Sequence, residues 1–249
     1  MLRDARAIVD FNQAHRDRWV ATVAARLPAG VRVLDVGAGE CRYRSLFSHC
    51  RYETHDFRQY AGTHTGVQKE EWHYGPIDYT SDIAALPVPD ASFDALLCTE
   101  VLEHVPEPIR ALGELSRVLK VGGTLFLSAP LGSGLHQQPH HYYGGYTPHF
   151  YRRFLPEHGF ELLHIVPNGG FYRHLLQELH RAAGLIQKQR HYARVHPAYW
   201  ILRLGFARYL PRWLAQLDDE NLIPEFTVGY HVEARKIRPP HPDETTPQR

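Results

Sequence analysis

The sequence lacks several features that define whole classes of protein. Its 28 Lys and Arg residues nearly balance 27 Asp and Glu residues, so no charge excess draws it to nucleic acid. Three cysteines, Cys41, Cys50 and Cys98, have no metal-finger spacing, and so few are typical of reduced thiols in the cytoplasm. No run of about 20 apolar residues could span a membrane, and the charged N-terminus does not fit a signal peptide. We therefore expect a cytoplasmic globular protein.

Short apolar segments alternate with amphipathic helical patterns through the first half of the chain. Strands of this kind, separated by helices, are typical of an α/β fold with a parallel sheet and right-handed crossovers. The patterns predict strands over 31–36, 51–57, 74–78, 93–99 and 124–129, and helices over 41–49 and 107–119, the latter closed by Gly122 and Gly123.

The flanking regions complete the expected organisation. A helix within residues 1–30 is expected to pack on a single domain over 31–238, and 239–249 to form a flexible tail. The loop over 131–149 is too rich in Gly, Pro and His to be regular. After it we expect a helix over 151–158, a strand over 160–166, a helical insertion over 168–224 and a last strand over 225–237. The insertion contains helices over 171–189 and 196–217.

A glycine-containing turn follows the first predicted strand. Asp35, Gly37 and Gly39 lie where a strand would meet a helix, a place at which a nucleotide can approach the backbone closely. Arg42 replaces the third glycine of the dinucleotide fingerprint, which argues against NAD or FAD. Asp56 ends the second predicted strand, where a carboxylate can accept both hydroxyls of an adenosine ribose. These residues favour an adenosine ligand without a pyrophosphate.

Three motifs in succession carry a family resemblance. VLDVGAGECR, DIAALPVPDASFDALLCTEVLEHVPEP and RVLKVGGTLFLSAP resemble motifs of class I S-adenosylmethionine-dependent methyltransferases, and look most like the type 11 branch that includes ubiquinone- and menaquinone-pathway enzymes. The resemblance implies a Rossmann-like sheet, mostly parallel with an antiparallel last strand, and S-adenosyl-L-methionine as cofactor. By the same resemblance, the cofactor-binding residues are Asp35, Gly37, Ala38 and Gly39 at the methionine portion, Asp56 and Phe57 at the ribose, Asp82 and Ile83 at the adenine, and Thr99, Glu100 and Val101 at the sulfonium.

Methyl transfer is an in-line displacement, so proximity and alignment provide most of the acceleration. A base is needed only when the acceptor must lose a proton. The loops after the fourth and fifth strands should frame the acceptor, and they contain the candidate bases His104, His140 and His141 and the candidate substrate contacts His136, Tyr143 and Tyr146. The segment HQQPHHYYGGYTP resembles a stretch of bacterial glycan and small-molecule methyltransferases. Here His141 occupies an acidic position, and Gly144 and Gly145 stand where arginine is usual.

The histidine-rich loop leaves three interpretations open. His136, His140 and His141 could bind a metal ion, since neutral imidazole suits zinc, iron or nickel. Pro139 disfavours a continuous helix through them, and no HExxH motif is present. Proton transfer or hydrogen bonding to substrate is the favoured alternative, and a solvated loop is the third.

The sequence therefore predicts a methyltransferase (EC 2.1.1.-) for a small-molecule or glycan- or lipid-linked acceptor, with oxygen as the favoured atom. A cofactor-binding scaffold or regulatory partner without activity is the alternative. An NAD-dependent oxidoreductase is a less favoured alternative. RNA is a poor fit, because no basic surplus or RNA module is present. Arg203, Arg208 and Arg212 could bring the helix over 196–217 to an anionic membrane surface, although packing against the sheet or a neighbouring subunit is the favoured explanation of its apolar face.

Overall fold

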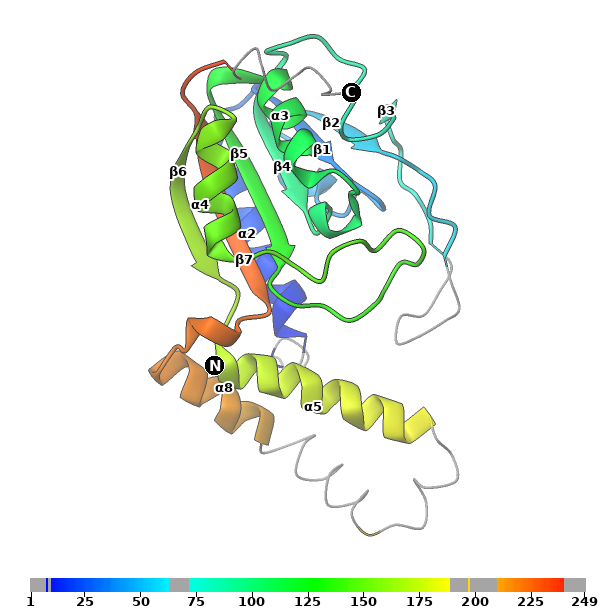
Figure 1. The fold of residues 1–249 in the computed structure, drawn as a ribbon, viewed down its shortest axis with the longest axis vertical. Coiled ribbons are helices and arrows are strands. Elements are labelled where there is room, and N and C mark those ends of the chain that lie inside the picture. Colours follow the sequence, from blue (N-terminus) through cyan, green and yellow to red (C-terminus); the bar gives the residue numbers. More distant parts are fainter. Residues whose placement is uncertain (1–7, 9, 63–71, 189–196, 198–209, 240–249) are drawn as a thin grey trace. The chain divides into compact units, whose positions relative to one another are not determined.

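The computed structural model describes residues 8, 10–62, 72–188, 197 and 210–239, and these form a seven-stranded sheet of order β3-β2-β1-β4-β5-β7-β6 (Figure 1). The parallel strands are β1 (Arg32–Val36), β2 (Arg51–Asp56), β3 (Tyr79–Thr80), β4 (Phe93–Thr99) and β5 (Leu119–Pro130). Strand β7 (Gly229–Lys236) pairs antiparallel with β5, and β6 (Phe160–Pro167) lies beyond it. The predicted fold class is confirmed.

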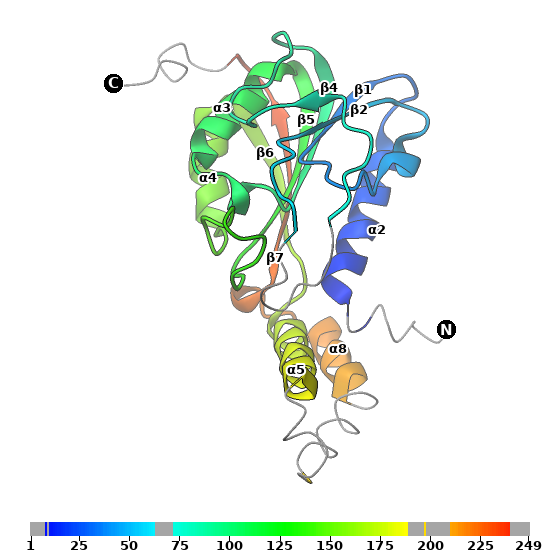
Figure 2. The ribbon, with the colours of Figure 1, turned by 90° about the vertical axis from the view of Figure 1, so that its right-hand side faces the viewer.

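Apolar residues alternate along the central strands and so build a core on each face of the sheet. Leu34 and Leu96 pack in a cluster with residues of α3 (Pro108–Val118) and α4 (Pro148–Glu157). Val33 and Leu97 point to the other face, where the second half of α2 (Phe11–Arg26) covers them. Figure 2 shows α2 on one side of the sheet and α3 and α4 on the other. This period-2 alternation fixes which side chains meet the helices on each face of the sheet.

The helix predicted over 41–49 does not form. Turns replace it, followed by the short 3₁₀ helix η1 (Arg44–Phe47). The cause lies at Cys41, whose φ of +57° is left-handed and cannot continue from the glycine turn into a right-handed helix. No helix N-terminus therefore stands behind the glycine turn, which removes the usual support for a bound pyrophosphate.

Two strand predictions also need correction. The strand expected over 74–78 does not form, and β3 begins only at Tyr79; Asp78 bonds to Thr54 through both its N–H and its carboxylate, and Gly75 donates to the carbonyl of Gly39. The glycine pair expected to close α3 lies inside β5, which begins directly after the helix. Gly123 sits at an irregularity in the β4–β5 pairing, where a Cβ would lie 2.8 Å from the carbonyl oxygen of Asp94.

Further along the chain, α4 begins at Pro148, three residues before the predicted start. The last strand begins only at Gly229, after the short 3₁₀ helix η4 (Pro224–Phe226). The predicted strand over 160–166 and helix over 171–189 correspond to β6 and α5 (Phe171–Lys188). The flexible tail predicted over 239–249 lies outside the described residues from position 240 onward.

The chain divides into two compact units, one formed by 19–166 and 229–249 and the other by 1–18 and 167–228. In the second unit, α8 (Leu210–Glu220) packs beside α5 through Leu176 and Leu214. Asp218 of α8 accepts a hydrogen bond from the N–H of Gly170 at 2.9 Å and so caps the start of α5. The predicted domain bounds remain a prediction.

Most of the helix expected over 196–217 lies outside the described residues, and so do Arg203 and Arg208. Of the three arginines in the membrane-surface hypothesis, the structure describes Arg212 alone. None of the helices that the structure describes is long and apolar enough to cross a membrane.

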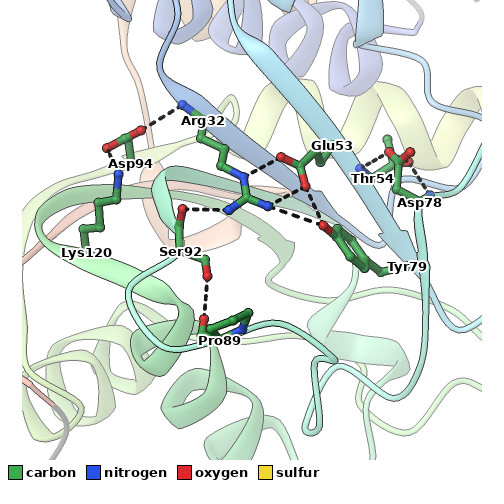
Figure 3. A network of polar contacts seen from close by, with 9 residues as sticks. All are labelled: Arg32, Glu53, Thr54, Asp78, Tyr79, Pro89, Ser92, Asp94 and Lys120. Atoms are coloured by element: carbon green, nitrogen blue, oxygen red, sulfur yellow. Dashed lines mark hydrogen bonds and ion pairs between the residues drawn. The ribbon is translucent and has the colours of Figure 1, made fainter.

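A polar network ties the strands together at their amino ends (Figure 3). The guanidinium of Arg32 donates to Glu53 at 2.5 and 2.9 Å, and the hydroxyl of Tyr79 donates to the same carboxylate at 2.6 Å. Asp94 accepts from the N–H of Arg32 at 2.8 Å and from Lys120 at 2.7 Å. Because β1 runs from Arg32 toward the glycine turn, the network lies at the amino ends of the strands, whereas the candidate site lies at their carboxyl ends.

Candidate active site

Gly37, Ala38 and Gly39 form a tight turn at the carboxyl end of β1. The N–H groups of Gly37 and Ala38 donate to the carbonyl oxygen of His55 at 2.8 and 2.9 Å, which holds the turn against β2. Gly37 has a φ of +73°, and a Cβ there would lie 2.4 Å from Cγ2 of Val101. Only glycine fits this position, so the turn presents bare backbone of the kind that lets a ligand approach closely.

Asp35 lies just before this turn with its side chain buried. The hydroxyl of Tyr52 donates a hydrogen bond to its carboxylate. Burial raises the pKa of Asp35 to about 7; the Tyr52 hydrogen bond opposes this rise, and the charge of Asp56 adds to it. Asp35 therefore changes charge near neutral pH, and a cation in the site would favour its ionised form.

Asp56 ends β2 and supports the glycine turn directly. Its Oδ2 accepts the N–H of Gly39 at 2.9 Å, and its Oδ1 accepts the N–H of Arg58 at 2.9 Å. The residue is buried, with 6% of its surface exposed. A carboxylate has about four lone-pair sites, so two backbone bonds leave it able to accept two hydroxyl groups as well.

An aromatic cluster beside this turn was not predicted. Trp72 lies 5.6 Å from Tyr60 and 6.1 Å from Tyr74 between ring centroids, with both pairs edge-on. A Cβ on Gly39 would lie 2.8 Å from Cζ2 of Trp72, so the indole covers the second glycine of the turn. The pair of large aromatic residues that follows the polar stretch over 61–71 was the only signal in the sequence.

Asp82 and Ile83 follow β3 at the same edge of the sheet. Asp82 is exposed, and its Oδ1 accepts the N–H of Ala84 at 2.8 Å, an Asx turn that fixes the local backbone. Ile83 is 6% exposed and packs into the core beside Leu86. Their roles at adenine stay predictions.

The carboxyl end of β4 brings Thr99, Glu100 and Val101 to the glycine turn. Val101 packs on Gly37, where its side chain fills the space that a Cβ would need. Glu100 has a φ of +54°, and its carboxylate accepts the hydroxyl of Ser128 in β5 at 2.7 Å. This connection fixes the backbone at the predicted sulfonium end between two strands.

The next turn, η2 (Leu102–His104), buries a carboxylate beside an imidazole. Glu103, which was not predicted, is 1% exposed, and its Oε1 lies 3.8 Å from Nε2 of His104. Nδ1 of His104 is 2.7 Å from the carbonyl oxygen of His140, so Nδ1 carries the proton. Burial, with smaller contributions from nearby His136 and His141, lowers the pKa of His104 to about 4, although the hydrogen bond to the carbonyl of His140 opposes this shift. His104 is therefore neutral at pH 7.

The loop after β5 places two more imidazoles beside His104. The ring of His136 lies 4.7 Å from that of His104 and 4.4 Å from that of His141. Ser133 donates its hydroxyl to the carbonyl of Gly144 at 3.0 Å, which leaves its oxygen to accept Nε2–H of His141 at 3.1 Å. His141 therefore keeps its lone pair on Nδ1. Burial, and then His136, lowers the pKa of His141, which favours the neutral ring.

His140 lies apart from this cluster, because its ring meets the ring of Phe57 edge-on at 5.1 Å. The alternative metal set of His136, His140 and His141 shares only His136 with the atoms that converge here, and it stays a prediction. Within the described part of the chain, the ligand atoms that converge are those of Glu103, His104 and His136, all within 4.8 Å of one another.

The two predicted tyrosines differ in what they can offer to an acceptor. Tyr143 is exposed and donates its hydroxyl to the carbonyl of Pro106 at 2.9 Å. Tyr146 is buried in the core, and its hydroxyl donates to the carbonyl of Leu102 at 2.7 Å. This hydroxyl joins the loop to η2, and the contact of Tyr146 with substrate stays a prediction.

Comparisons with known proteins agree with this geometry. A family model described as "Methyltransferase domain" matches residues 34–127. An uncharacterised methyltransferase of Mycobacterium bovis is 31% identical over 229 residues, covering 86% of this chain and 79% of its own. A ubiquinone biosynthesis O-methyltransferase of Xanthomonas axonopodis is 37% identical over 120 residues, covering 43% of this chain and 46% of its own.

Among solved structures, a putative sarcosine dimethylglycine methyltransferase of Galdieria sulphuraria has a TM-score of 0.54 at 17% identity, covering 91% of this chain and 85% of its own. That likeness concerns the fold. The glycine cradle and the carboxylate of Asp56 suit the nucleoside and amino-acid portions of S-adenosylmethionine. The chain belongs to the class I S-adenosylmethionine-dependent methyltransferases, and S-adenosyl-L-methionine is its cofactor.

Proposed function

We propose that the protein methylates a hydroxyl oxygen on a small-molecule or glycan- or lipid-linked acceptor. The observation that carries this proposal is the cluster of His104, His136 and His141 beside the carboxyl end of β4. A neutral amine needs no base before it attacks a methyl group, whereas a hydroxyl must lose its proton. The lowered pKa values of His104 and His141 favour neutral imidazoles, so the site favours oxygen. The partial match to a ubiquinone O-methyltransferase supports the same choice.

The cofactor supplies the methyl group from its sulfonium, and we assign its surroundings as follows. Asp35 and the glycine turn hold the methionine end, where the ionised carboxylate attracts the ammonium group. Asp56 accepts the ribose hydroxyls. The remaining assignments are Phe57 at the ribose edge, Asp82 and Ile83 at adenine, and Thr99, Glu100 and Val101 at the sulfonium.

We assign proton acceptance to His141. Its Nε2–H is held by Ser133, so Nδ1 presents a fixed lone pair. When the acceptor oxygen takes the methyl group and S-adenosylhomocysteine leaves with the electron pair of the broken S–C bond, this Nδ1 would take up the hydroxyl proton. His104 is less suited, because its pKa of about 4 makes it a weak base at pH 7. His136, His140 and Tyr143 complete the wall against which the acceptor is aligned.

The alternative of an inactive scaffold rests on Gly144 and Gly145 replacing the usual arginine. The loop around them is well built. A Cβ on Gly145 would lie 2.4 Å from the carbonyl oxygen of Pro130, and the N–H of Tyr146 donates to that oxygen at 2.7 Å. Glycine therefore closes the loop at a place where arginine would not fit. This closure favours a retained function over decay.

The proposal is tested by methyl transfer from labelled S-adenosylmethionine into fractions of a source-cell extract. Once an active fraction is found, His141→Gln should lower kcat by about a hundredfold with cofactor affinity nearly unchanged. His149→Gln, an exposed histidine of α4, is the matched control and should keep full activity. Cofactor binding without transfer to any fraction would favour the scaffold, and full activity of His141→Gln would reject the assigned base.

A further inference from the structure

Glu103, His104 and His136 bring three potential metal-ligand atoms together, all within 4.8 Å of one another. Glu103 and His104 come from η2 after β4, and His136 comes from the loop after β5. The two histidine rings meet edge-on with centroids 4.7 Å apart. The loop is held against η2 by its backbone, since the N–H groups of Tyr142 and Tyr143 both donate to the carbonyl of Glu103. The juxtaposition is therefore built into the fold.

Hydrogen bonds fix which nitrogen of each ring is available. Nδ1 of His104 donates to the carbonyl of His140 at 2.7 Å, and Nδ1 of His136 donates to the carbonyl of Gly134 at 2.9 Å. With Nδ1 as the donor, the nitrogen of each ring that can bind a metal ion is Nε2. A backbone carbonyl on the far nitrogen is the usual support of a metal-binding histidine, because it fixes the tautomer and orients the ring.

A cation between His104 and Glu103 would stabilise the contact between their two ligand atoms. Nε2 of His104 and Oε1 of Glu103 are 3.8 Å apart, and neither atom of this pair carries a proton when Nδ1 is protonated. Two lone pairs that face each other at this distance repel one another. Burial of Glu103 at 1% exposure strengthens the effect, because a low dielectric screens charge weakly.

We propose that Glu103, His104 and His136 bind a divalent transition-metal ion of the zinc type. Two imidazoles and one carboxylate are a common donor set of open zinc sites, which keep a further position for solvent or substrate. Tetrahedral bonds of about 2.1 Å place ligand atoms about 3.4 Å apart, so Nε2 of His104 and Oε1 of Glu103 need to approach by only a few tenths of an ångström. His136, on the loop, provides most of the adjustment.

The open position of this site would face the region assigned to the acceptor. An acceptor hydroxyl bound there would lose its proton more readily, since a divalent ion stabilises the oxyanion. That consequence rests on the proposed function, whereas metal binding itself does not. The two can fail separately, because binding is measured without any acceptor.

The test uses the full chain stripped with a chelator and titrated with Co²⁺, whose visible absorption reports its coordination, followed by competition with Zn²⁺. We expect one tightly bound equivalent. His136→Ala and Glu103→Gln should each weaken binding at least tenfold, the scale for loss of a ligand or its support. His149→Ala, which removes an exposed histidine outside the cluster, should bind as the unmodified chain does.

Surface histidines alone would give weak binding of several equivalents, equal in all variants, and this result would overturn the proposal. If Glu103→Gln fails to fold, His136→Ala decides the matter, because His136 is only partly buried on a loop. Metal content after gel filtration, measured by mass spectrometry, provides a second readout that does not depend on absorption.

Discussion

Replacement of Asp56 by Ala tests the assignment of the ribose carboxylate. In the unliganded protein the variant loses two hydrogen bonds, from the N–H of Gly39 and from the N–H of Arg58, both at 2.9 Å. Loss of a bond to a charged group costs about 1.5–3 kcal/mol. Relaxation and water offset part of this, so we expect the free energy of unfolding to fall by about 2–4 kcal/mol.

The same variant should weaken S-adenosylmethionine by about 1–3 kcal/mol, roughly 5- to 150-fold, because ribose hydroxyls would be left unpaired. Asp56→Asn keeps one carbonyl oxygen and should recover part of both effects. Isothermal titration measures affinity, and urea denaturation measures stability. The titrations are carried out well below the melting temperature of the least stable variant, so that every sample is folded.

Asp78→Ala is the matched control for a purely structural loss. Asp78 also accepts two hydrogen bonds at 2.9 Å, from the N–H and the hydroxyl of Thr54 in the same strand (Figure 3). It should lose stability and keep its affinity. Unchanged affinity in Asp56→Ala would refute the assignment, and an equal loss of affinity in Asp78→Ala would show that destabilisation alone explains the effect.

Two further predictions concern the turn. Because the folded-state pKa of Asp35 is raised to about 7 from an ordinary 3.8, ionisation costs the unliganded protein stability as pH rises toward 7, while affinity for the positively charged cofactor rises over the same range. Calorimetry and thermal melting from about pH 6 to pH 7.5 should show these opposite trends, and Asp35→Asn should flatten both. Gly37→Ala should cost more stability than Gly30→Ala, whose Cβ would meet nothing within 4 Å at a similar φ of +81°. Each carries about 1–2 kcal/mol for backbone strain. Val101→Ala in the Gly37→Ala background should restore only the additional loss of stability that comes from the contact with Val101. If urea denaturation shows the same loss of stability for Gly37→Ala and Gly30→Ala, the predicted contact is contradicted.

The central strands could be predicted from the sequence because local pattern and tertiary environment agree there. The apolar run of β4 is bounded by turn residues, and the structure places it over Phe93–Thr99 as expected. The predicted helix over 41–49 failed for a local reason, since the left-handed backbone of Cys41 is not encoded in its residue type. Helix propensity cannot reveal such a conformation.

The candidate site was predictable where a motif lies on one strand end and not where distant segments meet. The glycine turn and Asp56 follow from strand boundaries. Glu103 gives no sign in the sequence of being buried, because its neighbours in η2 and in the loop after β5 decide its environment. His140 looked equivalent to His141, yet a turn over 137–140 precedes His141, and the ring of His140 meets Phe57 while that of His141 meets His136. Only the folded chain separates them.

The contact between Phe57 and His140 has a thermodynamic consequence. Phe57 directly follows the proposed ribose carboxylate, while the carbonyl of His140 holds the ring of His104 at 2.7 Å. A shift of Phe57 on cofactor binding would therefore displace His140, whose carbonyl holds the ring of His104. Linkage requires the coupling to be reciprocal, so an acceptor that binds more tightly in the presence of S-adenosylmethionine must tighten S-adenosylmethionine by the same factor.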